Sequence, residues 1–323
     1  MKNLKSLRWA KGLSMMLLVA GAPLLTSCDN DDDDATPTPT YSNFSDVLSG
    51  NTDYSLMRAA VTRAGLTDSL NRSNVTIFLP NDAAFRAAGF ADAAAVNNAS
   101  VSDLQRILRY HVVGSRVLPS AFETTGSASP ASLGGQNLYI TRNSGGQVFV
   151  NNARVQQTGI EGFENGQVYV IDRVLMPATG NLLQVAQADT SLSFLVAAAR
   201  RAGGTVFNSL SSTTTPVTVF APTNAAFRAA GFRDTTAIGA ANRDTLTRIL
   251  TYHVVPGRVF APTLTNNQSV TTAQSGAFNV TVGTNNAVSI TGRGNNNQAA
   301  NVTRPDIMAT NGVVHVIDRV LRP

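Results

Sequence analysis

Apolar positions at helical spacing occur twice in the first half of the chain and twice in the second. An i, i+3, i+4, i+7 spacing places one apolar stripe on each predicted helix. The four stripes are Met57, Ala60, Val61 and Ala64; Leu104, Ile107, Leu108 and His111; Leu195, Ala198, Ala199 and Ala202; and Leu246, Ile249, Leu250 and His253. Gly65 and Gly203 stop the first and third stripes. Ser102 with Gln105 has capping-box spacing, and Asp82 is placed to cap a further short helix.

Short β-branched and apolar runs with Gly/Asn turns dominate the later part of each half. Val75 to Leu79 predicts one early strand that ends at Pro80. Later strands are predicted at 137–141 and 147–150, around a turn at 143–146, and at 280–282 and 287–290, around Asn285-Asn286. Each half closes on an apolar strand, at 168–175 or 313–321. Helices gathered early and strands late predict an α+β fold.

Three blocks of sequence occur twice, in the same order. Phe78 to Phe90 returns at 220–232 and Ile107 to Val113 returns at 249–255, both shifted by 142 residues. Asn165 to Leu175 returns at 311–321 with a shift of 146, so four extra residues are expected in a loop between the blocks. This period is far above that of a solenoid, so each copy is predicted to be a domain. We place the domains at 41–177 and 181–323, with a short linker near Pro177 to Gly180.

The first 27 residues resemble an export signal. Residues 1–12 are basic, and the mostly apolar run from Leu13 to Leu25 is too short for a bilayer span of about 20 residues. The run ends in Leu25-Thr26-Ser27-Cys28, which resembles the lipobox of bacterial lipoproteins. Cys28 is the only cysteine, so the fold contains no internal disulfide and rests on core packing. We expect residues 1–27 to be a lipoprotein signal peptide and Cys28 to carry lipid.

Residues 28–40 combine an acidic run, Asp29 and Asp31 to Asp34, with alternating Thr and Pro. Like charges repel and prolines stiffen the chain, so an extended tether is predicted. The run resembles the signal that sends some Gram-negative lipoproteins to the outer face of the outer membrane. An aspartate directly after the lipid-bearing cysteine means inner-membrane retention in other bacteria. We expect an outer-membrane, lipid-anchored protein at the cell surface, with a periplasm-facing location as the alternative.

Composition and motifs argue against several classes of function. The net charge of +5 falls to +1 without residues 1–27, and no arginine cluster is interleaved with aromatics, so nucleic-acid binding is not expected. No His or Cys pair has metal-ligand spacing, and no G-x-S-x-G elbow is present. Gly292-Arg293-Gly294 lies in a turn-rich region and is interpreted as a loop. We predict no enzymatic activity, no metal and no cofactor.

The repeated blocks resemble the signature motifs of the fasciclin (FAS1) family. Thr-Val-Phe-Ala-Pro-Thr-Asn-Ala-Ala-Phe at 218–227 is similar to the first signature, Tyr252-His253 to the central Tyr-His motif, and Asn-Gly-Val-Val-His-Val-Ile-Asp at 311–318 to the second signature. The first copy departs from this pattern, with Tyr169 where the second has His315. It also has Asp82 against Asn224 and Gly114 against Pro256. The second copy is therefore nearer the family pattern.

This resemblance implies two tandem FAS1-like domains, each a β-sandwich or wedge with helices packed on it. It also implies cell adhesion, or binding of an extracellular protein, glycan or matrix component. We therefore predict an exported, lipid-anchored adhesion or binding protein. The alternatives are a non-catalytic structural component of a biofilm or matrix, and an enzyme-associated subunit that binds a ligand between the domains. The partner and the oligomeric state stay open.

Two sequence elements supply candidate contact residues. A Tyr-His pair ends the same helix in both copies; hydrogen-bonded packing of the helix end is the favoured interpretation for the histidines, and the tyrosines are the better contact candidates. Pro305-Asp306-Ile307-Met308 resembles the core of an integrin-contact motif in animal fasciclin proteins, with an ordinary turn as the competing interpretation. The candidate partner-binding residues are Tyr110, His111, Tyr252, His253, Asp306 and Ile307.

Overall fold

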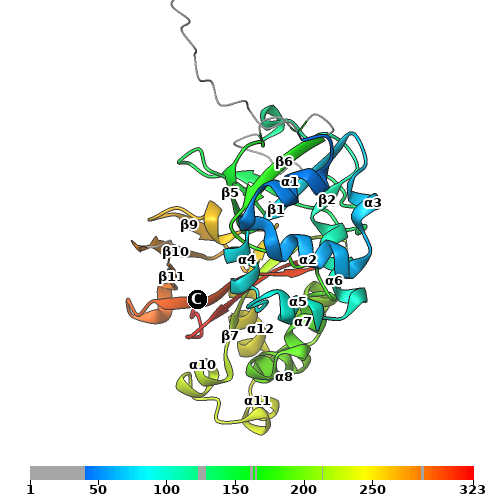
Figure 1. Ribbon diagram of the computed structural model, residues 1–323. Coiled ribbons are helices and arrows are strands. Elements are labelled where there is room, and N and C mark those ends of the chain that lie inside the picture. The colour runs from blue at the N-terminus through cyan, green and yellow to red at the C-terminus, as the bar shows by residue number, and fades with distance from the viewer. Residues whose placement is uncertain (1–40, 123–128, 161–162, 164–165, 213, 285–286) are drawn as a thin grey trace, which may run out of the picture. The chain divides into compact units, whose positions relative to one another are not determined.

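The computed structural model describes residues 41–323, apart from 123–128, 161–162, 164–165, 213 and 285–286. The signal peptide, Cys28 and the tether predicted from the sequence lie outside the described residues, as does the turn at Asn285-Asn286. One series of helices and strands runs from residue 44 to 171, and a second series of the same order runs from 182 to 317 (Figure 1).

Six α-helices and six strands make up the described part of the first series. The helices are α1 (Phe44–Gly50), α2 (Ser55–Ala64), α3 (Thr67–Leu70), α4 (Asp82–Ala87), α5 (Ala93–Asn97) and α6 (Val101–Tyr110). The strands are β1 (Val75–Pro80), β2 (Val112–Val113), β3 (Ile140–Arg142), β4 (Val148–Val150), β5 (Ala153–Gln157) and β6 (Gly166–Ile171).

The second series repeats this order and adds one strand. Its helices are α7 (Leu182–Ala188), α8 (Ser193–Ala202), α9 (Gly204–Ser211), α10 (Asn224–Ala229), α11 (Thr235–Ala240) and α12 (Arg243–Tyr252). Its strands are β7 (Val217–Pro222), β8 (Val254–Pro256), β9 (Ser269–Thr271), β10 (Ala277–Val282), β11 (Val288–Thr291), β12 (Ala300–Ala309) and β13 (Gly312–Ile317).

In each half the first long strand pairs in parallel with the last. The sheets have the orders β2-β1-β6-β5-β4-β3 and β8-β7-β13-β12-β11-β10-β9. The parallel pairs are β1 with β6 and β7 with β13, and every other pairing among the described strands is antiparallel. The closing strand of each copy thus lies inside the sheet, between β1 and β5 in the first half and between β7 and β12 in the second.

The central strands are apolar throughout because both of their faces are buried. In β1, Val75, Ile77 and Leu79 point into a core shared with the helices. Phe78 points to the opposite face, into a second core formed with the later strands. Alternate residues of a strand face opposite sides, so a continuous apolar run serves two cores at once. Two helix-side cores and two strand-side cores result, one of each kind per half.

The predicted α+β class, with helices packed on strands in two tandem copies, is confirmed. The helix at Met57 ends as expected, because Gly65 adopts the left-handed conformation with φ of 64°. The closing strands are shorter than predicted and end at Ile171 and Ile317. The residues beyond them leave the sheet, and the N–H groups of Leu175 and Leu321 bond to histidines instead.

Two predicted helix starts are wrong. Asn81 caps α4 by accepting from the Ala84 N–H at 2.9 Å, while the Asp82 carboxylate accepts from Ser55 and from the Leu56 N–H, at the start of α2. Ser100, and not Ser102, is the cap of α6. Gln105 makes no capping box and instead donates to the Ala64 carbonyl, which tightens the contact between α6 and α2.

Candidate functional site

The two Tyr-His pairs lie in the interior of their domains, at the ends of α6 and α12. His111 Nδ1 lies 2.9 Å from the Ile107 carbonyl, and His111 Nε2 accepts the Leu175 N–H at 2.9 Å. His253 repeats the arrangement with Ile249 and Leu321. A backbone N–H can only donate, so Nε2 must be the unprotonated nitrogen and Nδ1 carries the proton. Each histidine therefore fastens the segment after the closing strand to the end of a helix.

Burial and these bonds hold both imidazoles in the neutral form. Loss of hydration disfavours the imidazolium and lowers the pKa of His111 and of His253 to about 4. The bond to the helix carbonyl opposes this shift but is the smaller effect. Protonation at Nε2 would also break the bond to the backbone N–H.

The tyrosine hydroxyls are equally engaged. Tyr110 donates to the Asn137 carbonyl at 3.1 Å and accepts from the Asn151 amide at 3.0 Å. Tyr252 donates to the Ala277 carbonyl at 2.6 Å, and the Arg293 N–H donates to it at 3.3 Å. Both tyrosines and both histidines are at most 1% exposed. The side chains of these four residues therefore lie away from the surface. Partner contact through them stays an untested prediction.

Asp306 lies at an irregularity in β12, where the pairing with β13 shifts register between Arg304 and Ile307. Its φ is 61°, and its carboxylate is turned inward, where it accepts the Ala261 N–H at 2.7 Å. The Asp306 N–H donates to Nδ1 of His315, whose Nε2 donates to the Val259 carbonyl at 2.9 Å. Burial raises the pKa of Asp306 and lowers that of His315. Ile307 packs against the helix-side core of the second half. Contact with a partner through Asp306 and Ile307 likewise remains an untested prediction.

Tyr169 replaces His315 in the first copy and keeps one of its bonds. The Tyr169 hydroxyl donates to the Val117 carbonyl at 2.7 Å, in the same place as the bond from His315 to Val259. The longer side chain thus preserves the tie to this loop without an ionisable imidazole. This departure from the family motif is conservative in structural terms.

A clear difference between the copies lies between the strands β11 and β12. Val150 pairs with Ala153 in the first half, and Ile290 pairs with Ala300 at the same place in the second. Two residues separate the paired positions in the first copy and nine separate them in the second, so the second copy carries a seven-residue insertion. The repeated sequence blocks before and after this loop are shifted by 142 and 146 residues, a net difference of only four. Small deletions elsewhere offset part of the insertion, so comparison of the blocks conceals its full length.

The inserted loop is fastened to the C-terminal segment. Asn295 donates to the Val320 carbonyl at 2.9 Å and accepts from the Arg322 N–H at 2.7 Å, as a neighbouring strand would. Gly294 donates to the Arg322 carbonyl at 3.0 Å. A Cβ at Gly292 would meet Arg322 O at 2.8 Å, and one at Gly294 would meet Pro323 O at 2.9 Å. The two glycines of this loop are therefore needed for its close approach to the C-terminal segment.

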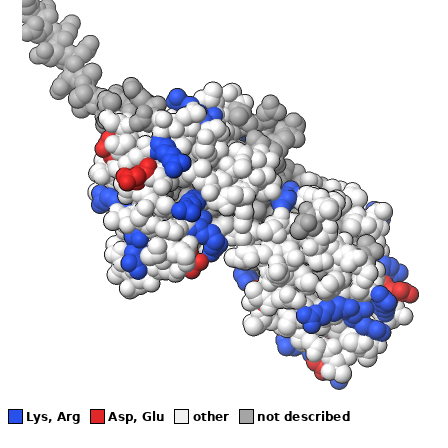
Figure 2. Space-filling view, turned by 90° about the vertical axis from the view of Figure 1, so that its right-hand side faces the viewer, with Lys and Arg blue, Asp and Glu red and all other residues white. Residues whose placement is uncertain are grey.

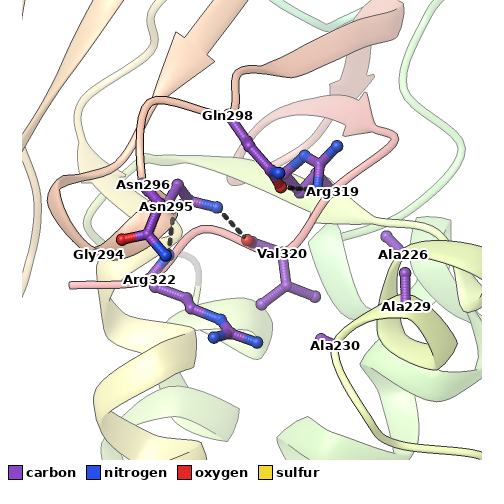
Figure 3. Close-up of a pocket in the computed structure, with 10 residues that line it drawn as sticks. All are labelled: Ala226, Ala229, Ala230, Gly294, Asn295, Asn296, Gln298, Arg319, Val320 and Arg322. Atoms are coloured by element: carbon purple, nitrogen blue, oxygen red, sulfur yellow. Dashed lines mark hydrogen bonds between the residues drawn. The ribbon is translucent and has the colours of Figure 1, made fainter.

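This loop forms one wall of a pocket of about 130 Å³, which we name the C-terminal pocket. Alanines of and after α10 form its floor, and the C-terminal segment, which is bonded to the loop, continues the same wall (Figure 3). Arg319 is committed to the loop, because it donates to the Ala299 carbonyl and to Gln298 Oε1. Arg322 reaches toward Ala230, and among the described residues its guanidinium has no hydrogen-bond or ion-pair partner. The lining residues are Ala226, Ala229, Ala230, Gly294, Asn295, Asn296, Gln298, Arg319, Val320 and Arg322.

Charge is distributed unequally between the two copies. Residues 181–323 contain eleven arginines and five aspartates, with no lysine or glutamate, a formal charge of +6. Residues 41–180 contain ten basic and ten acidic residues. Figure 2 shows surface arginines with few acidic side chains between them. The C-terminal pocket thus lies in the basic copy and has no acidic residue in its lining.

Metal-binding clusters and membrane-spanning helices are two other features that bear on the function of the described part of the chain. No group of three His, Cys, Asp or Glu side chains there is placed to hold a metal ion. No single helix in it is long and apolar enough to cross a membrane, although Leu182–Ala188 and Thr190–Ala202, bent by 109°, meet the length and composition requirement as a pair.

Comparison with known proteins assigns the family. The fasciclin domain matches residues 52–177 and again residues 190–323, so the chain belongs to the fasciclin domain family. The resemblance to this family that the three repeated blocks indicated is therefore confirmed.

Relatives come from animals and bacteria. Transforming growth factor-beta-induced protein ig-h3 of Sus scrofa is 28% identical over 250 residues, covering 77% of this chain and 34% of its own. Protein sll1483 of Synechocystis is 35% identical over 157 residues, covering 48% and 79%. The FAS1 domain pair of the insect cell adhesion molecule Fasciclin I, a solved structure, covers 83% of this chain and 96% of its own, at 20% identity and a TM-score of 0.42. This chain spans about a third of the length of the ig-h3 proteins.

Proposed function

We propose that this protein works outside the cell as a non-catalytic adhesion or matrix-binding protein, held to the outer membrane by lipid on Cys28. The observation that carries the proposal is the match of the fasciclin domain to both halves, since this family is implicated in cell adhesion and the extracellular matrix. Two features of the N-terminal sequence support the location. The lipobox-like residues 25–28 precede an acidic run, and residues 35–40 extend the spacer before the first domain.

The fold suits a binding role. Both copies use their histidines and tyrosines to fasten segments internally, so these polar groups stabilise the domains. Binding residues are commonly carried by surface loops on a rigid scaffold, and both copies have such loops between their strands. The partner proposed is an extracellular protein, glycan or matrix component.

Attachment of whole cells tests this function. Cells that carry the wild-type gene, a deletion, or Cys28→Ser are allowed to settle on immobilised extracellular matrix, and attached cells are counted. We expect attachment to fall in the deletion and in Cys28→Ser, with the variant protein released from membranes or left unprocessed. Protease added to intact cells should digest the wild-type protein. Equal attachment of all three strains would contradict the adhesion role, and complete protection from protease would place the protein facing the periplasm.

A further inference from the structure

Comparison with the first copy shows which parts of the C-terminal pocket occur in the second copy alone. Ala84, Ala87 and Ala88 stand where the second copy has the alanine floor of the pocket. Leu175 and Leu321 make the same bond to their histidines, so Met176 and Arg322 occupy matching positions. The second copy therefore adds a loop wall and an arginine to a floor that both copies share. The first copy folds with the same alanines and without either addition.

The groups that face the C-terminal pocket suit an anionic, hydroxyl-rich ligand. A guanidinium presents a planar fork that pairs with a carboxylate or sulfate through two parallel bonds. Amide groups both donate and accept, as sugar hydroxyls do. Asn296 is exposed and in the left-handed conformation, with φ of 50°, and its side chain has no partner among the described residues. Gln298 uses only its oxygen for Arg319, which leaves its NH₂ group to donate.

The size of the pocket and the charge around it restrict the class of ligand further. A volume of about 130 Å³ is close to the roughly 150 Å³ of a cavity that admits benzene, so it is on the scale of one six-membered ring. A protein partner would require a wider contact with an apolar centre, whereas the lining here is small and polar apart from Val320: alanine, glycine, amide and guanidinium groups. The +6 charge of residues 181–323 attracts polyanions over a Debye length, about 8 Å at physiological salt.

We propose that the C-terminal pocket binds an anionic sugar residue of an extracellular polysaccharide. Arg322 pairs with the carboxylate or sulfate, and Asn296 and Gln298 bond to the hydroxyls. This inference rests on the proposed function, because it names the ligand class of a matrix-binding protein. The seven-residue insertion makes the second copy the sugar-binding one.

Titration calorimetry of the purified full chain with trigalacturonate tests the proposal. Arg322→Met installs the residue of the first copy, and we expect it to raise the Kd at least tenfold with an unchanged melting temperature. Asn296→Gly retains the left-handed backbone while removing the amide, and should weaken binding about two- to fivefold. Arg248→Met is the matched control: it removes one exposed positive charge from α12, outside the pocket, and should alter the Kd less than twofold.

Three further ligands separate the possible sources of binding. Neutral maltotriose should bind much more weakly than trigalacturonate. A sulfated trisaccharide that binds more tightly than trigalacturonate would identify sulfate as the anion and leave the pocket assignment standing. Triglutamate that binds as tightly as trigalacturonate, with the same loss in Arg322→Met, would make the site a peptide site and overturn the proposal. Equal loss in Arg322→Met and Arg248→Met, or no binding of either anionic sugar, would also overturn it. Cells that still attach to matrix in that case would show that the adhesion role itself survives.

Discussion

Replacement of His253 should change how the stability of the second domain depends on pH. The pKa of His253 is about 4 in the folded protein, against 6.5 for the free side chain. Between these values the unfolded chain binds the proton more tightly than the folded one, so stability rises with pH. The contribution of the neutral His253 side chain to the free energy of unfolding is fully present above about pH 6.5 and is lost as pH falls toward 4. Linkage gives a loss of about 2 kcal/mol between pH 7.5 and 5, and roughly 3 kcal/mol in all.

His253→Leu removes this titration and two hydrogen bonds. The Ile249 carbonyl and the Leu321 N–H lose their partner, which costs about 2–4 kcal/mol at pH 7.5 for two buried groups. The variant should therefore be less stable at neutral pH, with a weaker dependence on pH between 7.5 and 5. Asp306 and His315 also titrate in this domain, in opposite directions, but they are common to both proteins and cancel in the difference.

Urea denaturation followed by circular dichroism at pH 7.5, 6 and 5 measures both quantities. His111→Leu is the matched variant in the first domain and should produce the same flattening there, because His111 has the same bonds and the same lowered pKa. A His253→Leu protein whose free energy of unfolding falls with acid as steeply as that of the wild type would refute the assignment of a buried neutral imidazole.

Two further predictions concern packing and domain structure. Gly312→Ala should destabilise the second domain by about 1–3 kcal/mol, since its Cβ would lie 2.0 Å from the Val217 carbonyl oxygen. The control Gly239→Ala, with open space around it, should be nearly neutral. Equal melting temperatures for the two variants would contradict the packing seen at β13. Residues 41–180 and 181–323, produced separately, should each unfold in one sigmoidal transition, and a featureless melt from both would show that the proposed boundary near residues 177–180 is misplaced.

The sequence predicts well the features that depend on local periodicity. Helix faces such as that of Leu104, Ile107 and Leu108 follow from the 3.6-residue repeat, and the central strands follow from continuous apolar runs. The end of the helix at Gly65 follows from the left-handed conformation that glycine permits. The structural interpretation of His111 and His253 agrees with their two hydrogen bonds each.

Features that depend on residues distant in the sequence cannot be predicted from local periodicity. The Asp82 carboxylate is bound by groups 26 and 27 residues away, so its local spacing suggested a cap that Asn81 provides instead. The inward turn of Asp306 requires an irregularity in β12 and a donor from Ala261. The C-terminal pocket was missed because a net shift of four residues conceals the longer insertion. Alignment of the paired strands, which the sequence alone does not fix, makes it visible.

Hydrogen–deuterium exchange of the full chain, with and without trigalacturonate, tests most directly whether the second domain holds the binding site. The ligand should slow exchange at residues 292–298 and 319–323, the two segments that contain the loop and C-terminal residues lining the C-terminal pocket. Residues 148–154, the corresponding turn of the first copy, should exchange at the same rate in both samples. Slowed exchange at 148–154 or at the helix ends around 110–111 and 252–253, with none at 292–298, would contradict the assignment and return the site to the Tyr-His motifs.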